Sequence, residues 1–143
     1  MRCLGIDYGE RRIGLSHGDD LGVAVPLPAA TEKTFAERLA HIVAEANGRR
    51  ITDLVVGYPY NMDGSAGFKA REVDAFIERL SQELPLPIHR IDERLSSRAA
   101  TDHLPKRRDD ELRRSGKIDS MAACLILQDF LNQHIPHEFD SGT

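Results

Sequence analysis

The order of the hydrophobic patterns constrains the fold of this chain more than any other feature. Two short apolar runs, residues 2–7 and 12–17, flank a tight turn at Tyr8-Gly9-Glu10 and predict a β-hairpin. A third short strand is expected over residues 22–26, ended by the Pro26-Leu27-Pro28 segment. The domain is therefore predicted to open with two or three antiparallel strands.

From Phe35 onward, helical patterns alternate with short apolar runs. Apolar side chains spaced three and four residues apart predict a first helix that is capped by Thr34 and ends at Asn47-Gly48. We expect further helices over residues 73–84, 96–103 and 118–133, and buried parallel strands over residues 51–56 and 88–92. A hairpin followed by alternating helices and strands predicts a mixed α/β sheet with helices on its faces.

The size and composition are those of one soluble globular domain, with 143 residues, 41% of them hydrophobic and 29% charged. We expect this domain to span residues 1–133 and the tail, residues 134–143, to be disordered because it has little apolar content. No apolar run approaches the roughly 20 residues of a membrane span, and no signal peptide is evident, which predicts a cytoplasmic protein without a membrane partner. The two cysteines form no Cys-x-x-Cys motif, so we expect no structural zinc site.

Asp7 interrupts the first apolar run at its end. A buried carboxylate costs free energy unless it is hydrogen-bonded, paired or bound to a metal, and Gly9 permits close approach of backbone or phosphate. Asp-x-Gly is also ordinary turn chemistry. These residues alone are equally compatible with a turn and with an active site.

A second acidic position is Asp92-Glu93, at the end of the strand expected over residues 88–92. The two-residue period of a strand places Glu93 on the face of Ile91, and Asp92 on the face of Arg90. This period does not decide which of the two carboxylates is functional, since the strand can end before either one.

Asp119 is the third acidic position, and it begins the apolar stripe of the last expected helix. Ala122 and Ala123 leave room for this helix to lie close against the sheet, which would press Asp119 toward the strand ends. The alternative is a carboxylate favoured only by the positive N-terminal end of the helix dipole.

Carboxylates that converge from strands and a helix repel one another unless a cation lies between them. Enzymes that cleave phosphodiesters with two metal ions about 4 Å apart provide the usual reason for such a cluster. Magnesium suits it because this ion takes oxygen ligands from few carboxylates. The serines have no convincing histidine partner, so a Ser-His hydrolase is not expected.

Basic residues gather between positions 94 and 117, in a chain whose formal net charge is −4. This run includes Arg94 and the Lys106-Arg107-Arg108 segment, which the acidic residues Asp109, Asp110 and Glu111 follow and dilute. A mixed-charge run is typical of a solvated loop or helix face, and it also suits contact with phosphates. The charges alone leave both interpretations open.

Four motifs in order resemble the YqgF family of pre-16S rRNA nucleases, also described as Holliday junction resolvase-like proteins. The resemblance covers about Leu4 to Leu131. Its carriers are Gly5-Ile6-Asp7-Tyr8-Gly9 with Arg12-Ile13-Gly14, Val55-Val56-Gly57-Tyr58-Pro59 with Asn61-Met62-Asp63-Gly64-Ser65, Asp92-Glu93-Arg94-Leu95, and Asp119-Ser120-Met121-Ala122-Ala123.

This resemblance implies an RNase H-like fold, with three antiparallel strands followed by parallel ones in a five-stranded sheet. It implies a hydrolase in which Asp7, Glu93 and Asp119 are both the catalytic residues and the ligands of Mg²⁺ or Mn²⁺, with two ions. The substrate-binding residues that we expect are Arg12, Asn61, Ser65, Arg94, Lys106, Arg107 and Arg108.

The implied activity is endonucleolytic maturation of the 5′ end of the small-subunit rRNA precursor. The partners are then nucleic acid, with precursor rRNA ahead of branched DNA, and the ribosomal or transcription machinery. Compared with true junction resolvases, position 122 is alanine in place of a fourth carboxylate, which weakens the case for junction cleavage.

Three alternatives remain at this stage. The first is a Holliday junction resolvase-like DNA nuclease, and the second is a nucleic-acid-binding protein that uses the same fold without catalysis. The Asp-x-Gly hairpin also resembles the phosphate loop of actin-like sugar kinases. Those proteins need two such domains, however, and 143 residues cannot hold them.

Overall fold

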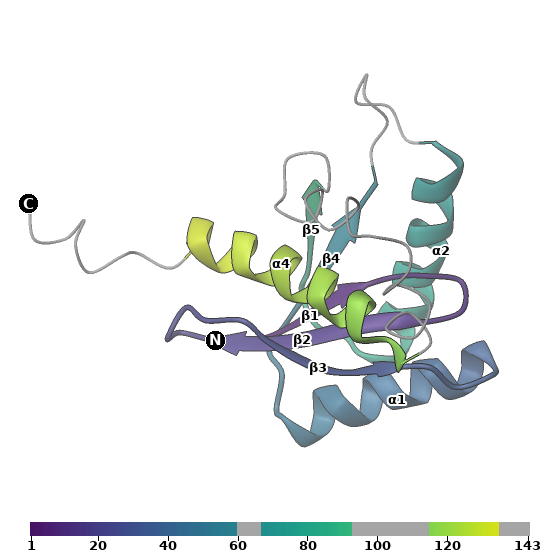
Figure 1. Ribbon diagram of the computed structural model, residues 1–143, viewed down its shortest axis with the longest axis horizontal. Coiled ribbons are helices and arrows are strands. Elements are labelled where there is room, and N and C mark those ends of the chain that lie inside the picture. The colour runs from purple at the N-terminus through teal and green to yellow at the C-terminus, as the bar shows by residue number, and fades with distance from the viewer. Residues whose placement is uncertain (60–66, 93–114, 135–143) are drawn as a thin grey trace, which may run out of the picture.

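The computed structural model describes residues 1–59, 67–92 and 115–134, which form a mixed five-stranded sheet between helical layers (Figure 1). The strand order is β3-β2-β1-β4-β5. The strands are β1 (Arg2–Asp7), β2 (Ile13–Asp19), β3 (Val25–Ala30), β4 (Asp53–Tyr58) and β5 (Ile88–Asp92). The helices among the described residues are α1 (Phe35–Gly48), α2 (Phe68–Glu83) and α4 (Lys117–His134).

The sheet has the predicted division into antiparallel and parallel halves. β1 and β2 form the expected antiparallel hairpin, in which Asp7 is paired with Gly14. β4 runs parallel to β1, and β5 runs parallel to β4. The carboxyl ends of these three parallel strands therefore meet at one edge of the sheet, where Asp7 lies.

The third strand differs from the prediction over residues 22–26. β3 starts at Val25 and includes both Pro26 and Pro28, which were expected to end it. A proline cannot donate a hydrogen bond to a neighbouring strand, but β3 lies at the edge of the sheet and pairs with β2 alone. Gly22 instead belongs to the preceding turn, with a φ of +82° that favours glycine.

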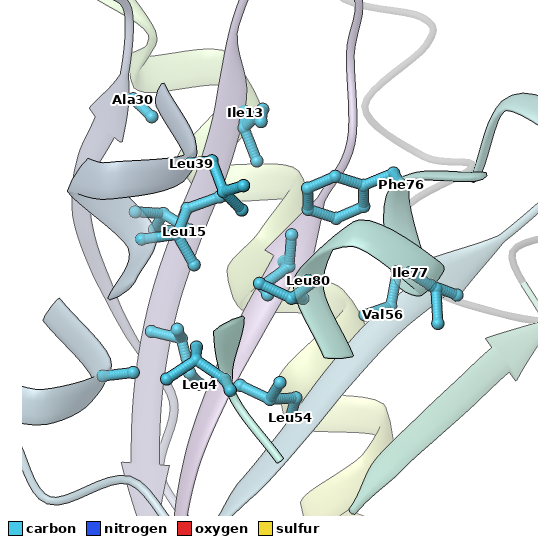
Figure 2. Close-up of a cluster of buried hydrophobic side chains, with 14 of the residues drawn as sticks. Leu4, Ile13, Leu15, Ala30, Leu39, Leu54, Val56, Phe76, Ile77 and Leu80 are labelled. Atoms are coloured by element: carbon cyan, nitrogen blue, oxygen red, sulfur yellow. The ribbon is translucent and has the colours of Figure 1, made fainter. Parts of the chain in front are cut away.

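One face of the sheet packs against α1 and α2. Alternate residues of β1 and β4 point to this side because successive side chains in a strand face opposite ways. Figure 2 shows Leu4, Leu54 and Val56 beside Leu39 of α1 and Leu80 of α2, all of them buried. Thr34 caps α1 as predicted, since its hydroxyl accepts a hydrogen bond from the Glu37 backbone N–H at 3.2 Å.

Helix α4 covers the opposite face and crosses β1 and β2 (Figure 1). It packs through Ile126, Leu127 and Phe130 against a buried cluster that includes Val55. The approach is close: a Cβ atom added to Gly5 would lie 2.7 Å from Leu127 Cβ and 3.0 Å from the Ala123 carbonyl oxygen. The prediction that the small residues at the start of this helix bring it near the sheet is confirmed.

Within the described part of the chain, none of the helices combines the length and the hydropathy that crossing a membrane requires. Cys3 and Cys124 are free thiols. The helix expected over residues 96–103 and the tail from residue 135 lie outside the described residues.

Candidate active site

Asp7 is the last residue of β1, and its exposed fraction is only 5%. Every second residue of a strand points to the same face, so Asp7 shares a face with Cys3 and Gly5, the face that α4 covers. The structure thus places a buried carboxylate at the carboxyl end of a central strand, on the side of the last helix.

Asp119 lies in the first turn of α4, next to the strand end that carries Asp7. The contact is made at Gly14, the residue paired with Asp7 in the hairpin. A Cβ atom added to Gly14 would overlap the Asp119 carbonyl oxygen and would lie 2.9 Å from the Ser120 nitrogen. The expectation that α4 presses Asp119 toward the strand ends is therefore confirmed.

The start of α4 is set by Gly116, which was not among the predicted site residues. Gly116 has a φ of +79°, and its carbonyl accepts a hydrogen bond from Ser120 N–H at 3.0 Å. A side chain at this position would collide with Ala29 of β3. A glycine directly before an expected helix is the available signal, because it permits a left-handed turn into the first helical residue.

Arg12 is bound to Asp119. Its Nε donates to Asp119 Oδ2 at 3.0 Å, and the two side chains are 28% and 24% exposed. Arg12 was predicted to bind substrate. In the structure it orients the Asp119 carboxylate, although the two residues are 107 positions apart in the sequence.

The turn between β1 and β2 is held from two other sides. The Tyr8 ring stacks on Phe76 of α2, with ring centroids 4.7 Å apart. Arg38 of α1 donates from Nη2 to the Glu10 carbonyl at 3.0 Å. A Cβ atom on Gly9 would lie 2.6 Å from the Arg12 carbonyl, so the close approach expected at this glycine is made by the chain's own backbone.

Asp92 belongs to the opposite face of the sheet from Asp7. The preceding residue of β5, Ile91, is buried in the cluster beneath α4. Arg90, two residues before Asp92, faces α2: its guanidinium lies 5.6 Å from the Tyr58 ring centroid and contacts Asp74 at 3.5 Å. Alternation along the strand therefore directs Asp92 toward α2 and away from Asp7 and Asp119.

A cavity of about 410 Å³ opens in front of the β1–β2 turn. Asp119 and Arg12 line it from one side, and Lys69 and Glu72 of α2 line it from the other. Lys69 and Glu72 were not predicted as site residues. Their signal is a charged face in the first turns of a helix that follows a central strand.

The remaining predicted site residues lie outside the described residues. They are Asn61, Ser65, Glu93, Arg94, Lys106, Arg107 and Arg108. Among residues 1–59, 67–92 and 115–134, no three His, Cys, Asp or Glu side chains gather closely enough to hold a metal ion.

Solved structures with the same architecture define the class of fold. A Thermus thermophilus RuvC in complex with a Holliday junction substrate is 16% identical, with 93% of this chain and 95% of that chain covered and a TM-score of 0.58. The Fowlpox virus resolvase bound to Holliday junction DNA is 11% identical, with 95% of this chain and 100% of that chain covered and a TM-score of 0.54. The fold is therefore the RuvC-like version of the RNase H fold, as predicted.

The family follows from sequence. The family model described as "RuvX: Holliday junction resolvase" matches residues 1–133, and the chain belongs to this RuvX, or YqgF, family. A relative from Opitutus terrae, named "Putative pre-16S rRNA nuclease", is 56% identical over 137 residues, covering 95% of this chain and 94% of the relative. A relative of the same name from Synechococcus elongatus is 43% identical over 141 residues, covering 97% of this chain and 95% of that protein.

Proposed function

We propose that this protein is a metal-dependent endonuclease that cleaves phosphodiester bonds in structured RNA, with the 5′ end of precursor 16S rRNA as its substrate. Family membership and the names of the relatives support the reaction and the substrate. The observation that carries the proposal is the contact of α4 with Gly14, which brings Asp119 to the strand end that carries Asp7. Its place of action is the cytoplasm, alongside the ribosomal or transcription machinery.

The donor chemistry at this corner fits a hard divalent cation. Asp7 supplies a carboxylate that is nine-tenths buried, and Asp119 supplies a second carboxylate from the facing helix. Carboxylate oxygens are the ligands that Mg²⁺ and Mn²⁺ prefer, and a cation offsets the cost of burying such a charge. When bound, two such ions would activate a water molecule and stabilise charge on the phosphate.

Glu93 is the proposed third ligand. Asp92, the other candidate, alternates onto the α2 face with Arg90, while Ile91 belongs to the face of Asp7. Glu93 itself lies outside the described residues, and only a continuation of the two-residue period by one position would give it the same side as Ile91. This argument supports the residue that the family resemblance implied.

Arg12 has a positioning role in this proposal. Its ion pair through Nε holds Asp119 Oδ2 at the cavity wall, and we propose that its other guanidinium nitrogens, which bond to no other described residue, donate to a substrate phosphate. We propose Asn61, Ser65, Arg94 and the Lys106-Arg107-Arg108 segment as further substrate contacts, on the family motifs and their charge alone.

The proposal is tested by changing Asp7 to Asn. Asp7→Asn keeps the side-chain volume but removes a ligand charge, so we expect loss of Mg²⁺- or Mn²⁺-dependent cleavage of a labelled precursor rRNA fragment, with the folded structure retained by circular dichroism. The matched control is Asp20→Asn, because Asp20 lies near the other end of the sheet and pairs only with the N-terminal amine among the described residues. Substantial cleavage by Asp7→Asn would refute the mechanism.

A four-way DNA junction tests the resolvase alternative in the same assay. The description of the family model and the junction-bound fold neighbours favour this second candidate. Cleavage of the junction but not of the RNA would identify it as the correct one. Tight RNA binding without cleavage under either metal would instead indicate a binding protein.

A further inference from the structure

A second cavity, of about 370 Å³, adjoins the candidate active site. It lies between the β1–β2 turn and the connection from β3 to α1, and it shares Glu10, Arg11 and Arg12 with the first cavity. Lys33 and Arg38 complete its basic side. No role has been given so far to Arg11 or Lys33, and both side chains are exposed.

Arg38 is the unusual residue in this cavity because it is buried as a whole, with only 8% of the residue exposed. Nη1 donates to the Glu32 carbonyl at 2.6 Å, and Nη2 donates to the Glu10 carbonyl at 3.0 Å. Its Nε has no hydrogen-bond partner, and no carboxylate forms an ion pair with Arg38, among the residues that the structure describes. A buried cation held only by neutral carbonyls favours an anion nearby.

The charges around the cavity point the same way. Arg11, Lys33 and Arg38 provide three positive charges, against two negative charges from Glu10 and Glu32, and the fourth cation, Arg12, is paired with Asp119. One oxygen of the Glu32 carboxylate is engaged, since Oε2 lies 2.8 Å from His41 Nδ1, while Oε1 is buried without a hydrogen-bond partner among the described residues. A local excess of positive charge in a chain of net charge −4 marks this cavity as an anion site.

We infer that this second cavity binds a backbone phosphate of the nucleic-acid strand whose scissile bond lies in the first cavity. This inference rests on the proposed function for the identity of the strand. Glu10, Arg11 and Arg12 line both cavities, so the two cavities are neighbours, and we place successive phosphates of one strand in them. Arg11 and Lys33 contact the phosphate from the rim, and Arg38 adds a buried positive charge that fixes both loops around it.

The test measures binding, not cleavage. A fluorescently labelled precursor rRNA fragment is titrated with protein in the presence of a metal chelator, at several salt concentrations, and its length is checked on a gel. Each lost phosphate contact lowers the magnitude of the slope of log K against log salt by about 0.7–0.9. We expect this change for Lys33→Ala and for Arg11→Ala, with several-fold weaker binding in each case.

The control is Arg2→Ala, which removes an exposed arginine at the opposite end of β1 from Asp7. Its slope should equal that of the unmodified protein. Slopes for Lys33→Ala and Arg11→Ala that match the control, or absence of RNA binding by the unmodified protein, would overturn the inference. A further measurement uses a double variant that combines Lys33→Ala and Arg11→Ala. If the salt slopes are unchanged, but inorganic phosphate raises the melting temperature of the unmodified protein and not that of the double variant, the cavity binds free phosphate. The assignment to a nucleic-acid strand is then wrong.

These outcomes are separate from those of the proposed function. An Asp7→Asn variant that still cleaves RNA contradicts the metal mechanism but leaves the salt slopes of the second cavity unaffected. Equal slopes contradict the second cavity but leave the metal mechanism intact.

Discussion

Substitution of Gly14 by Ala tests the contact on which the candidate site depends. Gly14 lies within β2 and does not have a positive φ, so alanine is compatible with its backbone conformation. The added methyl group has no room, however, because it would overlap the Asp119 carbonyl oxygen. The obstacle is helix backbone and not the flexible end of a side chain, so relief requires the first turn of α4 to move away from β2.

The expected cost follows from that displacement. Restoring an ordinary van der Waals separation requires a shift on the order of 1 Å in a close-packed region. Overpacking of this kind destabilises proteins by about 1–3 kcal/mol, and a rigid backbone obstacle favours the upper end. For a domain of this size, about 3 kcal/mol lowers the melting temperature by roughly 10 °C.

Activity should fall further than stability requires. A shift of about 1 Å in a catalytic group is enough to lower a rate by about 100-fold, and Asp119 moves directly with the helix. We therefore expect roughly a 100-fold loss of metal-dependent cleavage at a temperature where circular dichroism shows the Gly14→Ala protein to be folded. Thermal unfolding and single-turnover cleavage are measured on the same preparation.

Gly48→Ala is the matched control because, apart from its neighbours in the chain and the adjacent backbone of α1, no heavy atom lies within 4 Å of a Cβ atom added at that position. Gly48 ends α1, where replacing glycine by alanine stabilises a helix by up to about 1 kcal/mol. If Gly14→Ala has the same melting temperature as Gly48→Ala and cleaves at the normal rate, α4 does not approach β2 as described.

Three further predictions concern the rest of the described structure. Ser16→Ala should lower the free energy of unfolding by about 1–2 kcal/mol in urea titrations, because the buried Ser16 hydroxyl donates to the Ala123 carbonyl at 2.8 Å; an unchanged midpoint would contradict this. Burial raises the pKa of the Cys3 thiol to about 11, so Cys3 should resist a thiol reagent at about pH 8 until the protein is denatured, and rapid labelling of the native protein would count against its burial. Burial, the largest single cause, acts to raise the pKa of Asp53, but the hydrogen bonds from His89 at 2.9 Å and from the Thr52 hydroxyl at 2.7 Å, with nearby positive charge, together shift it downward from 3.8. This pair therefore stabilises the fold above pH 3.8, and the stabilisation is lost as pH falls through the native pKa of Asp53. His89→Gln should make the free energy of unfolding, measured in urea, depend less on pH in this acidic range. An unchanged pH dependence would exclude the pair as the cause.

Much of the fold could be predicted from the sequence because its signals are local. The hairpin, the Thr34 cap and the apolar stripe behind Asp119 each depend on spacing within a few residues. The extent of β3 could not be predicted in this way. Pro26 and Pro28 end a central strand but are tolerated at a sheet edge, and edge position depends on the order of all the strands.

The candidate site was predictable in its residue types but not in its pairings. A carboxylate at a strand end and another at a helix start were both visible as patterns. That Arg12 binds Asp119, or that Arg38 joins the carbonyls of Glu10 and Glu32, depends on segments brought together only in the folded chain. Such contacts leave no periodic signal in the sequence.

The distance along the chain between Arg12 and its partner Asp119 also has a consequence for biosynthesis. Their ion pair spans 107 positions, so its two halves are made near the beginning and near the end of translation. A nascent chain that ends at β5 carries Asp7 and Arg12 but not the helix that supplies Asp119. Under the proposed function, a ribosome making this protein is therefore not exposed to its nuclease activity until α4 has left the exit tunnel, and a product truncated before α4 is inactive from the start.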